Sequence, residues 1–258
     1  SIDAGVDQYG GESDPEYIID LVNQGAISEA RVDESVRRIL RNKFDLGLFE
    51  TPFVDEAEVN ALVNLPEYVS LGMTAQRNAV VLLNNESSAL PLMAETRIFV
   101  DGLDPRVAAK YGTVVETPDE ADVVLLFLNT VFNGNQPAGT DRTLDQMMAT
   151  RFPDTNLAFN EEILAKAASY REVSQLVTLV DLNRPAVLTE LRDISGALVG
   201  TFGVSDEAML DVVFGKHNPV GKLPFELPSS MAEVEAQLED VPDDTANPLF
   251  PFGWGLSY

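Results

Sequence analysis

The sequence predicts an α/β protein, with a mostly parallel sheet flanked by helices in an α/β sandwich. Two observations lead to this fold class. Short, nearly continuous apolar runs recur through residues 79–202, and runs of this kind are typical of strands that are buried on both faces. Helical patterns separate the runs. Strands that alternate with helices form parallel sheets, because each crossover returns the chain to the same end of the sheet.

The first 49 residues carry two helical patterns. One begins at Pro15, where a proline is tolerated in the first turn, with Ser13 or Asp14 as its cap and Gly25 as its stop. The other runs through residues 28–47 and also ends at a glycine. Its apolar residues share one face because they recur every three or four positions: Val32, Val36, Ile39, Leu40 and Phe44.

The rest of the chain begins with an acidic, weakly periodic stretch at 50–66, whose prolines predict a linker. Beyond it, five apolar runs predict buried strands: 79–83, 97–100, 123–128, 176–182 and 197–202. Helices are expected between them, for example at 160–170 and 206–214, and a further short strand is expected at 223–227.

Composition excludes several classes of function. The chain has 42 Asp and Glu against 17 Lys and Arg, a formal charge of −25, which argues against nucleic acid and anionic membranes as partners and fits neutral substrates. The absence of cysteine excludes disulfides, thiolate catalysis and zinc–thiolate sites. The longest apolar runs, such as 123–131, are far shorter than the roughly 20 residues of a membrane span. No signal-peptide pattern is visible, and the localisation stays open.

Several segments, taken in chain order, resemble one enzyme family. They are Ala-Gly-Val-Asp at 4–7, Arg-Val-Asp-Glu-Ser-Val at 31–36 with Lys-Phe-Asp-Leu-Gly at 43–47, Ala-Val-Val-Leu-Leu-Asn-Asn at 79–85, Gly-Lys-His-Asn-Pro-Val-Gly-Lys-Leu-Pro-Phe at 215–225, and Pro-Phe-Gly-Trp-Gly-Leu-Ser-Tyr at 251–258. Together they resemble glycoside hydrolase family 3, the β-glucosidase family, along nearly the whole chain. Their order and spacing make chance a poor explanation.

The resemblance implies three parts. Residues 1–49 would be the C-terminal remnant of a truncated (β/α)8 barrel, 50–66 a linker, and 67–258 the α/β sandwich domain. It implies hydrolysis of β-linked glucosides or short oligosaccharides without a metal or organic cofactor. Family members are retaining enzymes, in which an aspartate attacks the anomeric carbon and a glutamic acid protonates the leaving oxygen. That aspartate lies in a Ser-Asp-Trp-like motif upstream of Ala-Gly-Val-Asp, and this chain starts too late to contain it.

The missing nucleophile leaves two readings of the chain. In the first, the partners are a carbohydrate substrate and an upstream or separate barrel segment that carries the nucleophile, and the chain alone is inactive. The apolar faces of the helices before residue 49 favour this reading, because they need a partner. In the second, the chain is a catalytically inactive carbohydrate-binding or scaffold module derived from the domain.

The proton donor is the second open question. In many similar β-glucosidases the glutamate stands in a Gly-Glu-Gly-x-Asp-Arg loop after a strand like 123–128. Gly139, Asp141 and Arg142 match the end of that pattern, but Ala138 stands at the glutamate position. Because alanine cannot donate a proton, the chain is compromised, takes its acid from elsewhere, or aligns differently in this loop. Asp141 becomes a candidate acid/base and Arg142 a candidate substrate-binding residue.

Three further residues are candidates from the sequence. Glu116 and Glu120 precede the strand at 123–128 and can serve as acid/base, although solvated acids are common in such turns. Trp254 can stack on a sugar, but an aromatic residue between glycines is more often an anchor. The last eight residues are too apolar for a disordered tail, and we expect them to dock as an ordered segment. The single histidine, His217, supports neither a metal site nor a catalytic triad.

Overall fold

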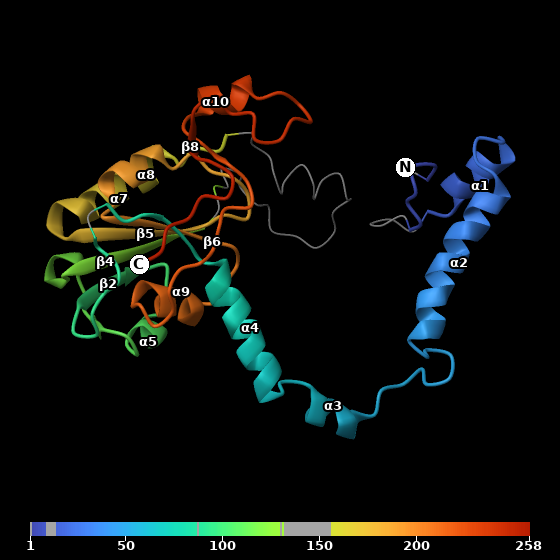
Figure 1. Cartoon of the computed structure of the whole chain (residues 1–258), viewed down its shortest axis with the longest axis horizontal. Coiled ribbons are helices and arrows are strands. Elements are labelled where there is room, and N and C mark those ends of the chain that lie inside the picture. Colours follow the sequence, from blue (N-terminus) through green and yellow to red (C-terminus); the bar gives the residue numbers. More distant parts are fainter. Residues whose placement is uncertain (1, 9–13, 87, 130, 132–155) are drawn as a thin grey trace. The chain divides into compact units, whose positions relative to one another are not determined.

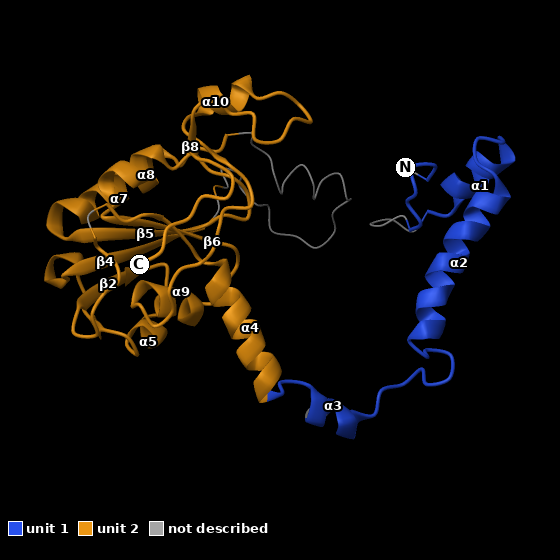
Figure 2. Cartoon of the chain, viewed as in Figure 1, with its two compact units in different colours: residues 1–65, 137–149 blue, residues 66–136, 150–258 orange. Residues whose placement is uncertain are grey.

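The computed structural model describes residues 2–8, 14–86, 88–129, 131 and 156–258. These residues fall into two compact units, one up to Leu65 and one from Pro66 onward (Figure 2). Unit 1 contains α1 (Glu16–Asn23), α2 (Glu29–Asp45) and α3 (Glu56–Leu62). Unit 2 contains a six-stranded sheet and the helices around it (Figure 1).

Glycine ends both long helices of unit 1, as the sequence predicts. The amide of Gly25 donates to the carbonyl of Val22, and the amide of Gly47 donates to the carbonyl of Phe44, each at 2.9 Å. Both glycines have positive φ angles, 70° and 65°. This left-handed conformation turns the chain back so that its amides reach the last helical carbonyls.

The two helices begin differently. The Oγ of Ser28 caps α2 by accepting a hydrogen bond from the amide of Arg31 at 3.2 Å. α1 has no side-chain cap, so the cap predicted at Asp14 is wrong. The reason is that Pro15 already has helical dihedral angles, φ −64° and ψ −20°, which places Asp14 one position too early to reach the free amides. The alternative cap, Ser13, lies outside the described residues.

The stretch at 50–66, expected as a linker, contains a helix. α3 occupies Glu56–Leu62, and the Oδ1 of Asp55 caps it by accepting from the amide of Ala57 at 2.9 Å. α4 (Pro66–Ala79) then opens unit 2 with a proline in its first turn. α4 was not predicted from the sequence, because none of its residues is buried and its apolar periodicity is therefore weak.

The sheet of unit 2 is mostly parallel, as predicted. Its strands are β1 (Val81–Asn84), β2 (Arg97–Asp101), β3 (Thr113–Val114), β4 (Val123–Leu128), β5 (Gln175–Asp181) and β6 (Ala197–Thr201), in the sheet order β1-β6-β5-β4-β2-β3. β2 to β6 are parallel, and β1 pairs antiparallel with β6 at one edge. Numbered among themselves, the five parallel strands lie in the order 2-1-3-4-5, which is a doubly wound arrangement.

Helices cover both faces of the sheet (Figure 1). One face carries α5 (Pro105–Ala108) and α9 (Asp206–Val213), and the other carries α7 (Glu161–Val173) and α8 (Thr189–Ile194). Because side chains alternate along a strand, Leu125 of β4 joins the core beneath α9, whereas Leu126 joins the core beneath α7 and α8. Two hydrophobic cores on opposite faces confirm the α/β sandwich. Among the described residues, no helix is long and apolar enough to cross a bilayer.

The strand expected at 223–227 is wrong for most of its length. β7 covers only Leu227–Pro228 and pairs antiparallel with β8 (Pro248–Phe250). Pro224 explains the difference. Proline has no amide hydrogen, so it interrupts the donors that a longer strand would need. The unit also contains the 3-10 helix η1 (Pro118–Glu120) and α10 (Met231–Ala236).

The last residues lie along the outer edge of β1. The amide of Leu256 donates to the carbonyl of Leu82 at 2.8 Å, forming an antiparallel bridge. The Nε1 of Trp254 donates to the carbonyl of Leu83 at 2.9 Å. These bonds confirm the prediction of an ordered end. They also cover a sheet edge whose free backbone groups would otherwise be open to another strand.

Candidate functional site

Four parallel strands of unit 2 end on the same side of the sheet, which we call the carboxyl edge. It holds the ends of β2, β4, β5 and β6. The direction of winding reverses between β2 and β4, and doubly wound sheets bind ligands outside the carboxyl ends of their strands at such a reversal. The chain leaves β4 at Leu128 into the connection 129–160. The carboxyl edge is therefore the candidate site.

Asp101 lies beside this reversal as the last residue of β2. Its Oδ2 accepts a hydrogen bond from the hydroxyl of Tyr170 at 2.9 Å and forms an ion pair with the Nζ of Lys166, both on α7. Burial, followed by the hydrogen bond to Asp101, raises the pKa of Tyr170 to about 12. The phenol thus stays a neutral donor near neutral pH. These three side chains form what we call the Asp101 cluster, which fastens α7 to the end of β2.

Gly102 brings the ends of β2 and β4 unusually close. It has a φ of 88°, and a Cβ built on it would lie 2.5 Å from the carbonyl oxygen of Phe127 in β4. Only glycine fits this approach. Two residues on, the amide of Asp104 donates to Oδ2 of Asp206 at 2.7 Å, which fastens the same loop to the first turn of α9.

Asp181 plays a similar part where β5 ends. Its Oδ1 accepts from the amide of Gly203 at 2.9 Å, and its Oδ2 accepts from the Nδ2 of Asn183 at 2.7 Å. The carboxylate therefore ties the loop after β5 to the loop after β6. Among the described residues, no cluster of three or more His, Cys, Asp or Glu side chains that could hold a metal ion includes Asp181 or Asp101.

The far end of the connection 129–160 returns to the carboxyl edge. The amide of Val187, in the loop after β5, donates to the carbonyl of Leu157 at 2.9 Å, and Ala158 forms a parallel bridge with Val187. The Oδ1 of Asn160 then caps α7. Both described ends of the connection thus lie at the edge that carries Asp101 and Asp181.

The candidate residues from the connection itself cannot be placed. Asp141, Arg142 and Ala138 lie outside the described residues. Glu120 is exposed in η1 (Pro118–Glu120), just before β4 begins. It therefore lies at the amino edge of the sheet, and the six residues of β4 separate it from the carboxyl edge by about 20 Å.

Glu116 and Trp254 lie at the two lateral edges of the sheet. Glu116 is exposed and follows β3, the outermost strand beside β2. Trp254 lies next to β1, with its ring centre 5.8 Å from that of Phe250 and 37% of its surface exposed. The structure consequently does not bring Glu116, Glu120 and Trp254 together.

Unit 1 has a polar centre of its own at Asp7, in the Ala-Gly-Val-Asp segment. Its Oδ1 accepts hydrogen bonds from the hydroxyl of Ser35 at 2.8 Å and from Nη1 of Arg38 at 3.0 Å. The guanidinium of Arg31 lies 3.5 Å from the same oxygen. The hydrogen bond from Ser35, and then that from Arg38, lowers the pKa of Asp7. Asp7 is thus held as an anion against α2.

A family model described as the glycosyl hydrolase family 3 C-terminal domain matches residues 100–258, which is more than half of the chain. The chain belongs to this family. The match begins within β2 and runs through the carboxyl edge to the last residue. It confirms the resemblance predicted from the sequence.

Two glycosidases are similar to this family 3 chain along its whole length. Beta-glucosidase C of Emericella nidulans is 44% identical over 263 residues, covering 100% of this chain and 41% of its own length. The periplasmic beta-glucosidase/beta-xylosidase of Dickeya chrysanthemi is 38% identical over 261 residues, covering 100% of this chain and 39% of its own length. The chain thus spans about two fifths of the length of these relatives.

The fold has close counterparts among solved structures. The β-glucosidase of Listeria innocua, crystallised with glucose, superposes with a TM-score of 0.71 at 22% identity, covering 100% of this chain and 43% of that chain. A likeness at this identity supports the family 3 fold of the sheet and its helices.

Sequence reasoning missed the Asp101 cluster of this family 3 domain. One signal was available, because Asp101 directly follows the predicted strand at 97–100, where a doubly wound sheet presents side chains to ligands. Lys166 and Tyr170 gave no such signal. Their spacing of four puts them on one face of a helix, but it does not say which strand that face meets.

Proposed function

We propose that this family 3 chain is the C-terminal sandwich domain of a retaining glycosidase that acts on β-linked glucosides or short oligosaccharides. The observation that carries the proposal is the 44% identity to Beta-glucosidase C of Emericella nidulans over 100% of the chain. An identity of this degree over the whole chain, to a protein named as a beta-glucosidase, supports a shared reaction.

The nucleophile would come from a barrel segment, either upstream or on a separate polypeptide. Retaining hydrolysis needs two carboxyl groups about 5 to 5.5 Å apart, one to attack the anomeric carbon and one to protonate the leaving oxygen. The sequence contains no Ser-Asp-Trp-like motif, since its single tryptophan is Trp254. The sandwich domain therefore supplies one side of the site, and the barrel segment supplies the attacking carboxylate.

The sandwich domain would contribute the proton donor from the connection 129–160. Asp141 is our candidate, with Arg142 as a neighbour that can hydrogen-bond the sugar. A donor must be protonated near neutral pH, and a carboxyl group achieves this when burial or a second carboxylate raises its pKa. The formal charge of −25 favours that condition and a neutral substrate.

Denaturing mass spectrometry of natively purified material tests the origin of the nucleophile. We expect the material to contain a Ser-Asp-Trp-like motif, either in a barrel segment upstream of this sequence on the same polypeptide or on an accompanying polypeptide. We also expect it to hydrolyse 4-nitrophenyl β-D-glucoside. The chain prepared alone should give no turnover, because a double displacement cannot proceed without its nucleophile. Turnover by the isolated chain that a point change within it abolishes would contradict the proposal.

Replacement of the candidate donor tests the second carboxyl group. In the active material, Asp141→Asn should lower kcat by 100-fold or more, in the range expected for general acid catalysis, and should remove the alkaline limb of the pH profile. Asp119→Asn is the matched control, since this exposed acid lies in η1 at the amino edge. Equal activity of both variants would exclude Asp141 as the donor.

Ala138 favours a second candidate function. Ala138 stands where the Gly-Glu-Gly-x-Asp-Arg loop of similar enzymes has its glutamate, so the chain can instead serve as an inactive carbohydrate-binding or scaffold module. This candidate predicts that the native material binds cellobiose in calorimetry but leaves 4-nitrophenyl β-D-glucoside intact. Hydrolysis by the native material would rule it out.

A further inference from the structure

Unit 2 has a hollow whose lining includes no residue of the Asp101 cluster. It has a volume of about 420 Å³, within the range of about 300 to 1,000 Å³ that is typical of small-molecule sites. We call it the Glu226 pocket. Its lining includes Pro185, Phe225, Glu226, Gln237, Asp243 and Phe252.

Glu226 lines this pocket and uses only one of its two carboxylate oxygens in hydrogen bonds within the described residues. The side chain is only 8% exposed, and its Oε1 accepts from the amide of Thr245 at 2.8 Å, from the Thr245 hydroxyl, and from Nε2 of Gln237 at 3.4 Å. Among the described residues, none donates to its Oε2. No fully enclosed side-chain oxygen or nitrogen in that part of the chain lacks a partner, so Oε2 keeps some accessible surface, and the pocket that Glu226 lines is a route by which a ligand can reach it.

A carboxylate oxygen that keeps some accessible surface on a nearly buried side chain can accept a hydrogen bond from a ligand. Removing a carboxylate oxygen from water without a hydrogen bond is costly, so a ligand hydroxyl at Oε2 would be well placed. The other oxygen keeps its bonds to Thr245 and Gln237, which fix the direction of Oε2.

The walls of the pocket are apolar. Phe225 is held edge-to-face against Phe202, with ring centres 6.0 Å apart. Phe252 is 61% exposed, so its ring face is open to a ligand. An apolar wall beside a small number of fixed polar groups suits a molecule with one apolar face and several hydroxyls.

The charge of the pocket further limits the class of ligand that it can bind. Glu226 and Asp243 are both acidic, and the whole chain carries −25, so an anion is disfavoured. A sugar ring has hydroxyl donors for the carboxylates and the amide, and its C–H face can lie on Phe252. We propose that the Glu226 pocket binds one sugar unit of a neutral saccharide. The choice of a saccharide rests on the proposed function.

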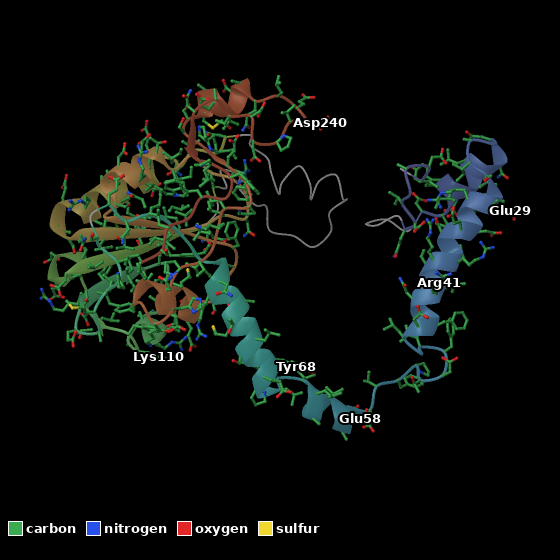
Figure 3. The ribbon with its side chains drawn as sticks, in the orientation of Figure 1. Glu29, Arg41, Glu58, Tyr68, Lys110 and Asp240 are labelled. Atoms are coloured by element: carbon green, nitrogen blue, oxygen red, sulfur yellow. The ribbon has the colours of Figure 1, made fainter. Side chains whose placement is uncertain are left out.

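The pocket lies at the same edge as the candidate site. Pro185 follows β5 in the loop whose Val187 bridges Ala158, and Phe202 follows β6. The segment between α10 and β8, where Figure 3 labels Asp240, supplies Gln237 and Asp243. A sugar held here would lie beside the return of the connection 129–160 to the sheet.

Saturation-transfer NMR of the full chain with cellobiose tests the proposal. We expect transfer to cellobiose protons and at least fivefold weaker binding for Phe252→Ala, which removes the open ring without disturbing the core. Phe53→Ala is the matched control, because Phe53 is 90% exposed and belongs to unit 1. Its affinity should stay within twofold of the parent chain. Absence of transfer, or equal affinities for the two variants, would overturn the proposal.

Glu226→Gln tests the role of Oε2. The amide keeps an acceptor for Thr245 but replaces Oε2 with a donor, so cellobiose should bind at least threefold more weakly while the Thr245 amide resonance stays near its parent position. Choline chloride is the comparison ligand, since acids beside aromatic rings also suit an ammonium group. Binding of choline without cellobiose would refute the saccharide assignment.

The two proposals can fail independently. If Phe252→Ala leaves the affinity for cellobiose unchanged while the native material still hydrolyses 4-nitrophenyl β-D-glucoside, only the proposal for the Glu226 pocket is refuted. If cellobiose binding depends on Phe252 but the native material does not hydrolyse 4-nitrophenyl β-D-glucoside, only the proposed enzymatic function is refuted.

Discussion

Arg77 of α4 and Asp211 of α9 form a nearly buried ion pair, with Nε 2.6 Å and Nη2 2.5 Å from the same oxygen, Oδ2. The hydroxyl of Tyr111 donates to Oδ1 of Asp211 at 2.7 Å. Burial, and then this hydrogen bond, raises the pKa of Tyr111, so the phenol remains a donor. One carboxylate, 7% exposed, therefore joins three elements that are distant in sequence.

Removal of Arg77 should leave that carboxylate with only the more distant Nζ of Lys216, 4.0 Å from Oδ1, as a countercharge. We expect Arg77→Ala to lower the free energy of unfolding of unit 2 by about 3 kcal/mol, because a buried ion that loses its partner keeps its desolvation cost. Urea unfolding followed by the fluorescence of Trp254, the single tryptophan, reports on this unit. The control is Arg106→Ala, whose ion pair with Asp104 involves a 90% exposed arginine, so its removal should cost far less stability. Equal losses would contradict the prediction.

Substitution of Gly102 by any residue with a side chain should destabilise the protein. Gly102→Ala places a Cβ 2.5 Å from the carbonyl oxygen of Phe127 and forces alanine to a positive φ, so we expect a loss of about 2 to 4 kcal/mol. Gly203→Ala is matched in its φ of 69° but meets nothing within 4 Å, and it should cost about 1 kcal/mol. The difference in urea midpoint isolates the steric part. A Gly102→Ala variant as stable as Gly203→Ala would show that β2 and β4 can separate.

Asp104 should titrate far below an ordinary aspartate. Hydrogen bonds from the side chain and then the amide of Arg106 lower its pKa to about 2. Its folded pKa lies below the unfolded value of about 3.9, so its contribution to stability is complete above pH 4 and is lost as the pH falls towards 2. NMR titration of the carboxyl carbon measures this directly, and Asp104→Asn should remove that part of the acid dependence. A midpoint near 4 would disprove the assignment.

Trp254 should act on stability more than on ligand affinity. Trp254→Phe keeps an aromatic ring but removes the Nε1 bond to the carbonyl of Leu83, so we expect a loss of about 1 kcal/mol, measured by circular dichroism since the fluorophore is gone. The affinity for cellobiose should stay within twofold. A fivefold drop in affinity would instead give Trp254 the sugar-stacking role that the sequence also allows.

The sequence predicts the sheet well because each strand is a local pattern. The runs at 123–128 and 176–182 are almost wholly apolar, and their observed strands differ from the predictions by at most one residue at each end. α4 and the shortened β7 were harder to foresee. α4 buries none of its residues, and the length of β7 depends on Pro224 and on pairing with β8, which is distant in the chain.

The candidate site was harder to predict than the fold. Asp101 meets Tyr170 across 69 residues of sequence, and Glu226 meets Thr245 across 19. Such pairs are set by strand order and loop packing, which local periodicity does not indicate. The family resemblance gave Asp141, Arg142 and Ala138 as residues of interest, and their placement stays a prediction.

The bridge between Leu82 and Leu256 joins residues 174 positions apart, since 256 minus 82 is 174. At a synthesis rate of about 5 to 20 residues per second, a nascent chain would keep the outer side of β1 uncovered for roughly 10 to 35 s after Leu82 is made. During that interval the outer carbonyls of β1, those of Leu82 and Leu83, lack the hydrogen bonds that Leu256 and Trp254 later supply. The domain is therefore expected to depend on chaperones during translation more than its compact final form suggests.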